Sequence, residues 1–369
     1  MDRLNNITNT LHSKTYTEPK GLVLITGVNG YIAAIAASHF LDHGYAVRGT
    51  VRKHTSAKEL IEGPLKQYAD AGTFNVVEVP DITVDGAFDE AVKGVTAIAH
   101  LASPVSFGFK DPTPILHAAI NGTKTVLNSA YAYAGPSLRT VVIMSSIAAV
   151  KNAAKPPYTF TEKDWNDTAE KVCEVKGTDT PGPVIYSASK VAAEKAFWEF
   201  QTEKKPPFTM TAVNPVFVIG PPLIAPKSAS AVGETIHSIW QVFSGVRDTA
   251  PMAGLPQVVD VRDVAQLLRY PIEHPDETNG ERYIASASAN HPQAIADVLR
   301  HEFKNDAKTL DRVAVGNPGK GYAADYSRID DQGDIDVDSS KARKLLEGGA
   351  WIPYDQSVID TAKTFVGLV

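Results

Sequence analysis

The sequence is poor in cysteine, in long apolar segments and in positive charge. One cysteine, Cys173, occurs among 369 residues, so the chain can form no internal disulfide; this favours a reducing compartment, the cytoplasm. No apolar segment approaches the ~20 residues that span a bilayer, and the polar segment 1–20 lacks the apolar core of a secretory signal. The net charge of −6 offers no basic excess for nucleic acid or an anionic membrane. Small molecules therefore remain as the expected partners.

Short apolar strands alternate with helical segments in the first 215 residues. The predicted strands are 21–26, 45–51, 74–79, 96–101, 140–144 and 208–213. Helical patterns cover 34–41, 56–72 and 111–134, and Gly122 inside the last of these indicates close packing. Alternation of this kind predicts an α/β protein with a doubly wound parallel sheet.

The first strand runs directly into a glycine turn, Gly27-Val-Asn-Gly30-Tyr-Ile-Ala33. Two glycines permit a tight turn and a close approach of phosphate to the backbone. The helix that follows offers free N–H groups and a positive dipole end. The spacing predicts a dinucleotide site, although a tight turn without a ligand is the alternative interpretation. The cofactor-binding residues predicted here are Thr26, Gly27, Asn29, Gly30, Tyr31 and Ile32.

The end of the second strand indicates which dinucleotide is bound. No acidic residue occurs from 45 to 53, and Arg52 and Lys53 close the strand. NAD-binding proteins place an acid here for the ribose 2′-hydroxyl, whereas cations suit the 2′-phosphate of NADP. We therefore predict NADPH; a solvated basic turn is the alternative.

Two further strand ends are expected at the same ligand edge of the sheet. Asp81, with Ile82 beside it, has two equally weighted interpretations: it accepts from the adenine amine, or it caps a helix over 83–92. Leu101-Ala102-Ser103 ends the fourth strand with small residues that leave space for a ribose and a nicotinamide. His100 before them is interpreted as an interior histidine rather than a base.

Tyr186 and Lys190 lie four residues apart and so share one face of a predicted helix. A tyrosine pKa of ~10 is too high for a good base at neutral pH, but a nearby cation lowers it. The pair can then exchange a proton with an alcohol or carbonyl. Ser145-Ser146, at the end of the fifth strand, places a hydroxyl where it can bind a carbonyl. A solvated helix face and a turn-capping serine are the alternatives.

Together these features resemble the short-chain dehydrogenase/reductase superfamily in its extended branch. Within it, the chain is most similar to the dihydroflavonol-reductase-like carbonyl reductases, which include fungal aldehyde, ketone and methylglyoxal reductases. The subgroup likeness comes from the strand 47–52 and the Ser-Pro at 103–104. The motifs that carry the likeness are Thr26-Gly27-x-x-Gly30-x-x-Ala33, His100-Leu-Ala-Ser-Pro104, Ser145-Ser146, Tyr186-x-x-x-Lys190, Asn214-Pro215 and Asp260-Val-Arg-Asp263.

The resemblance implies an NADPH-dependent carbonyl reductase with Ser146, Tyr186 and Lys190 as its catalytic residues. Tyr186 protonates the carbonyl oxygen, Ser146 polarises it, and Lys190 binds the nicotinamide ribose and lowers the Tyr186 pKa. Pro215 and Val216 border the nicotinamide. The expected substrate-binding residues are Ser103, Val105, Phe107, Ser146 and Tyr186. Tyr158, Phe160, Phe217 and Trp240 are further pocket candidates, each with lobe core as the alternative.

The same resemblance implies a Rossmann fold with a smaller, mostly C-terminal substrate lobe. We expect a flexible tail over 1–20, an NADP-binding domain over 21–215 with an inserted loop at 147–185, and mainly the lobe over 216–369, with some segments returning to the first domain. Asp260 to Asp263 should join the two parts by ion pairs. We expect a hydrophobic or aryl aldehyde or ketone as the substrate, and a monomer or homodimer as the assembly. No His or Cys group has metal-ligand spacing, so no metal is predicted.

Two other functions share parts of this pattern. A sugar-nucleotide epimerase or dehydratase uses the same Tyr/Lys pair with tightly held NAD, but its second strand usually ends in an acid. A non-catalytic NADP-binding regulator of the same fold typically loses the tyrosine. Arg52 argues against the first, and the retained Tyr186 and Lys190 argue against the second.

Overall fold

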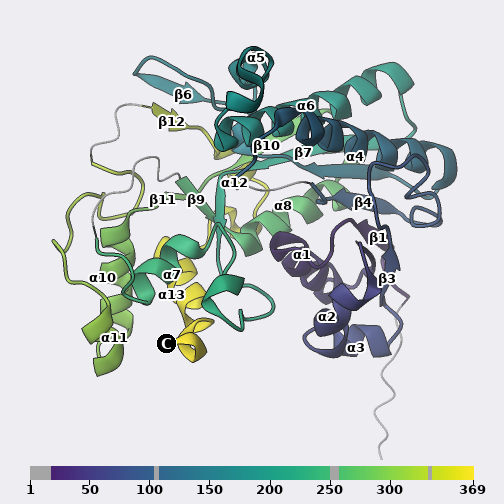
Figure 1. The fold of residues 1–369 in the computed structure, drawn as a ribbon. Coiled ribbons are helices and arrows are strands. Elements are labelled where there is room, and N and C mark those ends of the chain that lie inside the picture. The colour runs from purple at the N-terminus through teal and green to yellow at the C-terminus, as the bar shows by residue number, and fades with distance from the viewer. Residues whose placement is uncertain (1–17, 104–107, 250–256, 331–334) are drawn as a thin grey trace, which may run out of the picture.

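A parallel sheet forms the centre of the protein (Figure 1). The structure is a computed structural model that describes residues 18–103, 108–249, 257–330 and 335–369. Within these ranges, seven strands run in the order β3-β2-β1-β4-β5-β7-β10, and each neighbouring pair is parallel. The strand order reverses beside β1, which makes the sheet doubly wound. The strands are β1 Leu22–Ile25, β2 Ala46–Val51, β3 Phe74–Glu78, β4 Ala97–His100, β5 Thr140–Met144, β7 Thr209–Pro215 and β10 Glu281–Ala285.

Helices cover both faces of this sheet (Figure 1). One face is covered by α1 Tyr31–Asp42 and α8 Val261–Glu273, whose apolar side chains share a core with the sheet. The other face is covered by α4 Pro112–Tyr133 and α6 Gly182–Lys204, with α5 Asp167–Lys176 packed on α6. This arrangement confirms the predicted Rossmann-type α/β fold. It also explains the near-continuous apolar strands, since a parallel sheet is buried on both faces.

The long predicted helix over 111–134 is confirmed as α4. Asp111 caps it by accepting a hydrogen bond from the Thr113 N–H at 2.9 Å. Gly122 packs as the sequence indicates: a Cβ at this position would lie 2.8 Å from Ile82 Cδ1. The helix therefore presses directly on the loop that follows β3.

The single helix predicted over 56–72 is wrong, and the helix over 83–92 that one interpretation of Asp81 required does not form. The segment 56–72 divides into a 3₁₀ turn over 54–57 and two short helices, α2 Lys58–Glu62 and α3 Lys66–Asp70. Gly63 and Pro64 separate these helices, because a proline cannot donate to the helix and restricts the residue before it. The segment 83–92 forms turns, with Gly86 at a φ of +79° that a right-handed helix does not permit.

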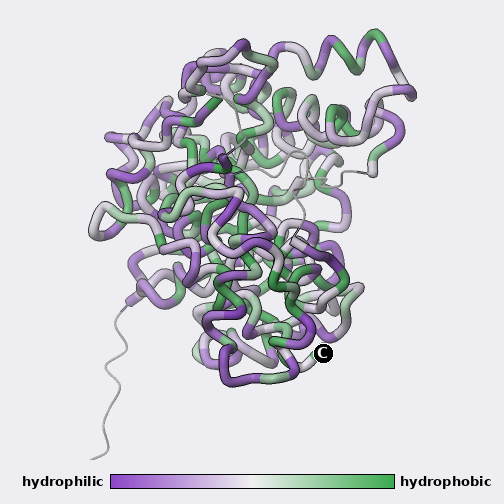
Figure 2. Tube along the Cα trace, turned by 90° about the vertical axis from the view of Figure 1, so that its left-hand side faces the viewer, coloured by the Kyte–Doolittle hydropathy of each residue, from purple (hydrophilic) through white to green (hydrophobic). Residues whose placement is uncertain are grey.

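A second, smaller part of the fold, the lobe, lies beside the sheet, at the lower left of Figure 1. It holds a three-stranded sheet, order β11-β9-β8, and helices that share a separate apolar core. The elements of this lobe are β8 Phe217–Ile219, α7 His237–Phe243, β9 Gln257–Asp260, β11 Ser288–Ala289, α10 Pro292–Glu302, α11 Ala307–Arg312 and α13 Tyr354–Lys363. Figure 2 shows hydrophobic segments gathered inside the molecule and hydrophilic segments on its outer loops.

The remaining short elements connect these parts. β6 Tyr158–Phe160 pairs in parallel with β12 Ile335–Val337, and α12 Ser340–Arg343 packs on β10. α9 Pro275–Thr278 leads from α8 to β10. The chain thus leaves the main sheet after β7 and returns to it with α8 and β10.

Ion pairs join the start of α8 to the C-terminal helix. Arg262 pairs with Asp260 and with Asp360 of α13, both at 2.8 Å. Asp260 is buried and also accepts from the Ser357 hydroxyl at 2.6 Å.

Among the described residues, no helix is both long and apolar enough to cross a membrane. The predicted tail over 1–20 lies outside the described residues except for its last three positions.

Candidate active site

A large cleft follows the carboxyl ends of the central strands. Its volume is about 1710 Å³, well above the ~300–1,000 Å³ of a drug-sized pocket. The glycine turn after β1, the end of β2, the loop after β3 and the ends of β4, β5 and β7 all line it. This edge, where the strand order reverses, is where open α/β sheets bind ligands.

Most of the residues predicted from the sequence line this cleft. Thr26 does not line the cleft, and Val105 and Phe107 lie outside the described residues. The lining residues that were predicted are Gly27, Asn29, Gly30, Tyr31, Ile32, Arg52, Lys53, Asp81, Ile82, Leu101, Ala102, Ser103, Ser146, Tyr186, Lys190, Pro215 and Val216.

The glycine turn has the geometry of a phosphate site. Gly27 has a φ of +68°, and a Cβ here would lie 3.3 Å from the Ala102 Cβ. Its N–H donates to the Thr50 hydroxyl at 3.2 Å, which ties the turn to β2. Gly30 begins α1 without any side-chain cap, so the first N–H groups of the helix face the cleft. These residues fit the diphosphate of a dinucleotide.

Thr26 supports the cleft from behind rather than lining it. It is fully buried, and its hydroxyl accepts from the Leu101 and Ala102 N–H groups at 2.9 Å each. It also lies 3.0 Å from the Nδ1 of His100. Burial, together with the charge of Lys190, lowers the pKa of His100 to about 3. His100 is therefore the neutral interior histidine that the sequence indicated.

Cations and a carboxylate meet where the second and third strands end. Arg52 and Lys53 are exposed at the cleft, with the hydroxyls of Thr55 and Ser56 nearby in its lining. Asp81 accepts from the Thr83 N–H at 2.8 Å and from its hydroxyl at 2.7 Å. These bonds, with Arg52, lower the Asp81 pKa. Because 83–92 is not helical, the helix-cap interpretation of Asp81 is wrong.

Tyr186, Lys190 and Ser146 meet at the floor of the cleft. Tyr186 and Lys190 project from α6, with the Lys190 ammonium 5.8 Å from the tyrosine ring centre. Ser146 follows β5 and hydrogen-bonds the Tyr186 hydroxyl. The Ser146 Oγ also accepts from the Ala148 N–H at 3.1 Å, which fixes the serine rotamer. Two hydroxyls thus point to one place, beside a buried ammonium.

Burial dominates the protonation of this group. It raises the pKa of the Tyr186 phenol, opposed by the Ser146 hydrogen bond and reinforced by the negative charge of Glu234. The net shift of the Tyr186 pKa is therefore upward, opposite to the net lowering expected from the sequence, because burial dominates it. Burial also lowers the pKa of Lys190 to about 8, and the charge of Glu194 opposes this. The phenol is therefore protonated at neutral pH, which is the form that a proton donor requires.

Three of the additional pocket candidates are wrong. Trp240 packs in the lobe core, 5.5 Å from the ring of Phe365. Tyr158 and Phe160 belong to β6 and border a separate hollow with Trp165, away from the main cleft. Phe217 does line the main cleft. Aromatic content alone could not separate these cases, because both core and pocket select aromatic side chains.

Several lining residues have no counterpart in the sequence reasoning. Glu234 and Thr235 come from the lobe, where the segment between β8 and α7 lacks strand or helix periodicity. Ile147, Pro183 and Ser187 come from the segments around the catalytic residues. Proximity to Ser146 and Tyr186 could have indicated the last three, whereas nothing local marks Glu234.

A doubly wound sheet, a glycine turn and a Ser/Tyr/Lys group over one cleft define a nucleotide-dependent oxidoreductase of the Rossmann class. The family model for the NAD dependent epimerase/dehydratase family matches residues 23–285. The chain belongs to this family, in the extended short-chain dehydrogenase/reductase branch.

Relatives with known names cover nearly the whole chain. The NADPH-dependent methylglyoxal reductase GRE2 of Saccharomyces cerevisiae is 31% identical over 354 residues, 92% of this chain and 96% of its own length. The ketoreductase azaE of Aspergillus niger is 33% identical over 330 residues, 88% of this chain and 91% of its own. The crystal structure of yeast methylglyoxal/isovaleraldehyde reductase Gre2 complexed with NADPH is 30% identical, with a TM-score of 0.79, and covers 94% of this chain and 98% of that one.

Proposed function

We propose that this chain is an NADPH-dependent carbonyl reductase, which interconverts an aldehyde or ketone and its alcohol. The observation that carries the proposal is the Ser146–Tyr186 hydrogen bond, with Lys190 one turn away, at the floor of the cleft that holds the glycine turn. Two hydroxyls that converge on one point can bind a single carbonyl oxygen. The relatives over almost the full length are named reductases.

Each catalytic side chain has a distinct role in this proposal. When bound, NADPH supplies a hydride to the carbonyl carbon. The Tyr186 hydroxyl donates its proton to the oxygen, on which the C=O electron pair accumulates. Ser146 donates a hydrogen bond to the same oxygen and stabilises this charge. Lys190 holds the nicotinamide ribose, and its positive charge favours the phenolate that remains.

The cofactor preference follows from the end of β2. Arg52 and Lys53 lie exposed at the cleft, and no acid follows β2 at the position that would bind a ribose 2′-hydroxyl. A guanidinium can bind the 2′-phosphate through two parallel hydrogen bonds. The names of the yeast relative and of the related crystal structure specify NADPH. In the proposed complex, Asp81 and Ile82 border the adenine.

The substrate end of the cleft is mainly apolar. Met144, Ile147, Pro183, Phe217 and Val218 line it together with the catalytic residues. This supports a hydrophobic or aryl carbonyl compound as the substrate, with Ser103 beside it. Val105 and Phe107 remain predicted contacts. The single cysteine supports a reducing compartment, the cytoplasm, where the chain acts as a monomer or homodimer.

Initial rates of NADPH oxidation test the proposal directly. A panel of aldehydes, ketones and diketones would be run with NADPH and with NADH, for the wild type and Tyr186→Phe. We expect turnover with NADPH, slower turnover with NADH, and at least a ~100-fold loss in the variant, as for removal of a general acid. Full activity of Tyr186→Phe would exclude the proposed acid. No turnover of any carbonyl by wild type that binds NADPH tightly would favour an epimerase or a regulator.

A further inference from the structure

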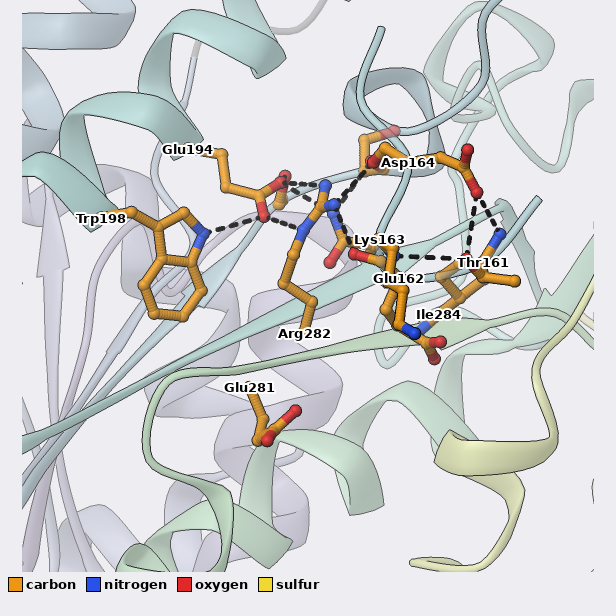
Figure 3. Close-up of polar contacts among 12 residues, drawn as sticks. Thr161, Glu162, Lys163, Asp164, Glu194, Trp198, Glu281, Arg282 and Ile284 are labelled. Carbon is orange, nitrogen blue, oxygen red and sulfur yellow. Dashed lines mark hydrogen bonds and ion pairs between the residues drawn. The ribbon is translucent and has the colours of Figure 1, made fainter.

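A buried ion pair lies one helical turn beyond Lys190, outside the group that touches the substrate. Glu194 of α6 is fully buried, and Arg282 of β10 is 7% exposed. The guanidinium Nε donates to one carboxylate oxygen at 2.6 Å and its Nη2 to the other at 3.3 Å (Figure 3). Buried ion pairs of this kind add little to stability compared with apolar packing. Stability alone therefore does not explain why this pair lies beside Lys190.

The Glu194 carboxylate also holds the end of the strand that carries the catalytic serine. It accepts from the Ser145 hydroxyl at 2.5 Å and from the Asn214 side-chain amide at 2.8 Å. The same amide donates to the Ser146 carbonyl at 3.2 Å. The Trp198 indole N–H completes the shell at 3.2 Å (Figure 3). The carboxylate is thus bonded directly to Ser145 and, through the Asn214 amide, to the backbone of Ser146.

Arg282 extends the network to the inserted segment. Its Nη1 donates to the carbonyls of Glu162 and Asp164 at 2.8 and 2.7 Å. Its guanidinium lies 4.0 Å from the centre of the Trp165 ring. The segment between β6 and α5 is therefore fastened to the helix that carries Tyr186.

The charges around Lys190 come from several elements. Glu194 opposes the effect of burial on the Lys190 pKa. His100 of β4 is neutral, and Glu234 of the lobe acts on Tyr186. Arg282 of β10 acts on Asp164 of the inserted segment. Glu194 and Arg282 carry opposite charges in contact, so the pair as a whole is neutral, although Glu194 still acts on the Lys190 pKa.

We propose that Glu194 is a positioning residue of the reductase site, which holds Ser145 and Ser146 in place, and that its pairing with Arg282 limits the negative field that Glu194 exerts at Lys190. This role rests on the proposed reductase function. Lys190 must be protonated for carbonyl reduction, because its positive charge favours the phenolate that Tyr186 leaves. A change in the net charge of the pair therefore moves the alkaline limb of the pH profile of kcat/KM. The direction of this shift depends on which partner of the pair is removed.

Charge-specific variants test this role. Glu194→Gln leaves the Arg282 cation unpaired, which lowers the pKa of Lys190; we expect the alkaline limb to move down by about one pH unit. Arg282→Gln leaves the Glu194 anion, and the limb should move up by a similar amount. The double variant is neutral and should return near the wild-type profile. Glu170→Gln, which breaks the half-exposed Glu170–Lys195 pair of α5 and α6, is the matched control and should leave the limb unchanged.

A purely structural pair would behave differently. Both single variants would then lose activity without opposite shifts, and that result would overturn the charge role. Ser145→Ala keeps both charges and covers the case in which the single variants do not fold. We expect it to lower kcat about tenfold, with KM for NADPH and the limb unchanged; an unchanged kcat would overturn the positioning role. The activity of the wild type and of Tyr186→Phe is measured first. Turnover by the wild type that is lost in Tyr186→Phe supports the reductase proposal, so a later negative result with the Glu194 and Arg282 variants concerns the positioning role alone.

Discussion

Replacement of Gly122 by alanine should weaken cofactor binding with little change in stability. The new Cβ would lie 2.8 Å from Ile82 Cδ1 and 3.2 Å from Cγ1, inside the ~3.5–4.0 Å of a carbon contact. Alanine favours the helix by about 1 kcal/mol, and overpacking costs about 1–3 kcal/mol. Ile82 is only half-buried and can turn away, which places the cost at the low end. The two contributions should therefore cancel to within about 1 kcal/mol.

The displaced loop is what should change function. Ile82 and Asp81 line the cleft where the adenine is proposed to bind. We expect KM for NADPH to rise about tenfold, equivalent to about 1.4 kcal/mol, with kcat unchanged. Ile82→Val removes the Cδ1 atom that the new methyl meets, so the double variant should recover most of the wild-type KM.

Urea unfolding and steady-state kinetics with varied NADPH provide the two readouts. A Gly122→Ala protein that gains about 1 kcal/mol of stability and keeps its KM would refute the reasoning. That result would mean that α4 does not press on the loop after β3. Failure of Ile82→Val to rescue the higher KM would place the cause elsewhere along α4.

Three further predictions concern charge. Arg52→Ala should raise KM for NADPH about 10–100-fold, the loss of a charged hydrogen bond, and leave KM for NADH nearly unchanged; equal losses would contradict a 2′-phosphate role. Glu234 raises the Tyr186 pKa, so in Glu234→Gln the phenolate absorbance that Tyr186→Phe removes should appear at lower pH. Burial raises the Asp263 pKa to about 7, so stability is lost as pH rises from about 4 through 7. Asp263→Asn should remove this loss in urea midpoints from pH 5 to 8, and an unaltered slope would exclude the assignment.

Local sequence was sufficient for most of the main sheet. Buried parallel strands are continuous apolar runs, so β1 to β5 and β7 were all predicted close to their observed bounds. The helices over 56–72 and 83–92 failed because Gly63-Pro64 and Gly86 interrupt segments whose composition otherwise suits a helix. A glycine or proline at one position changes the backbone conformation without changing the hydrophobic pattern around it.

The sequence by itself determined the chemistry-bearing motifs, because the glycine turn and the Tyr186–Lys190 spacing are local and each implies its geometry. The tertiary structure alone decided how these groups are charged and held. Arg282 meets Glu194 across 88 residues of chain, and Glu234 reaches Tyr186 from the lobe. The direction of the Tyr186 pKa shift reversed for the same reason. Burial outweighs a neighbouring cation, and burial depends on contacts between segments that no local pattern relates.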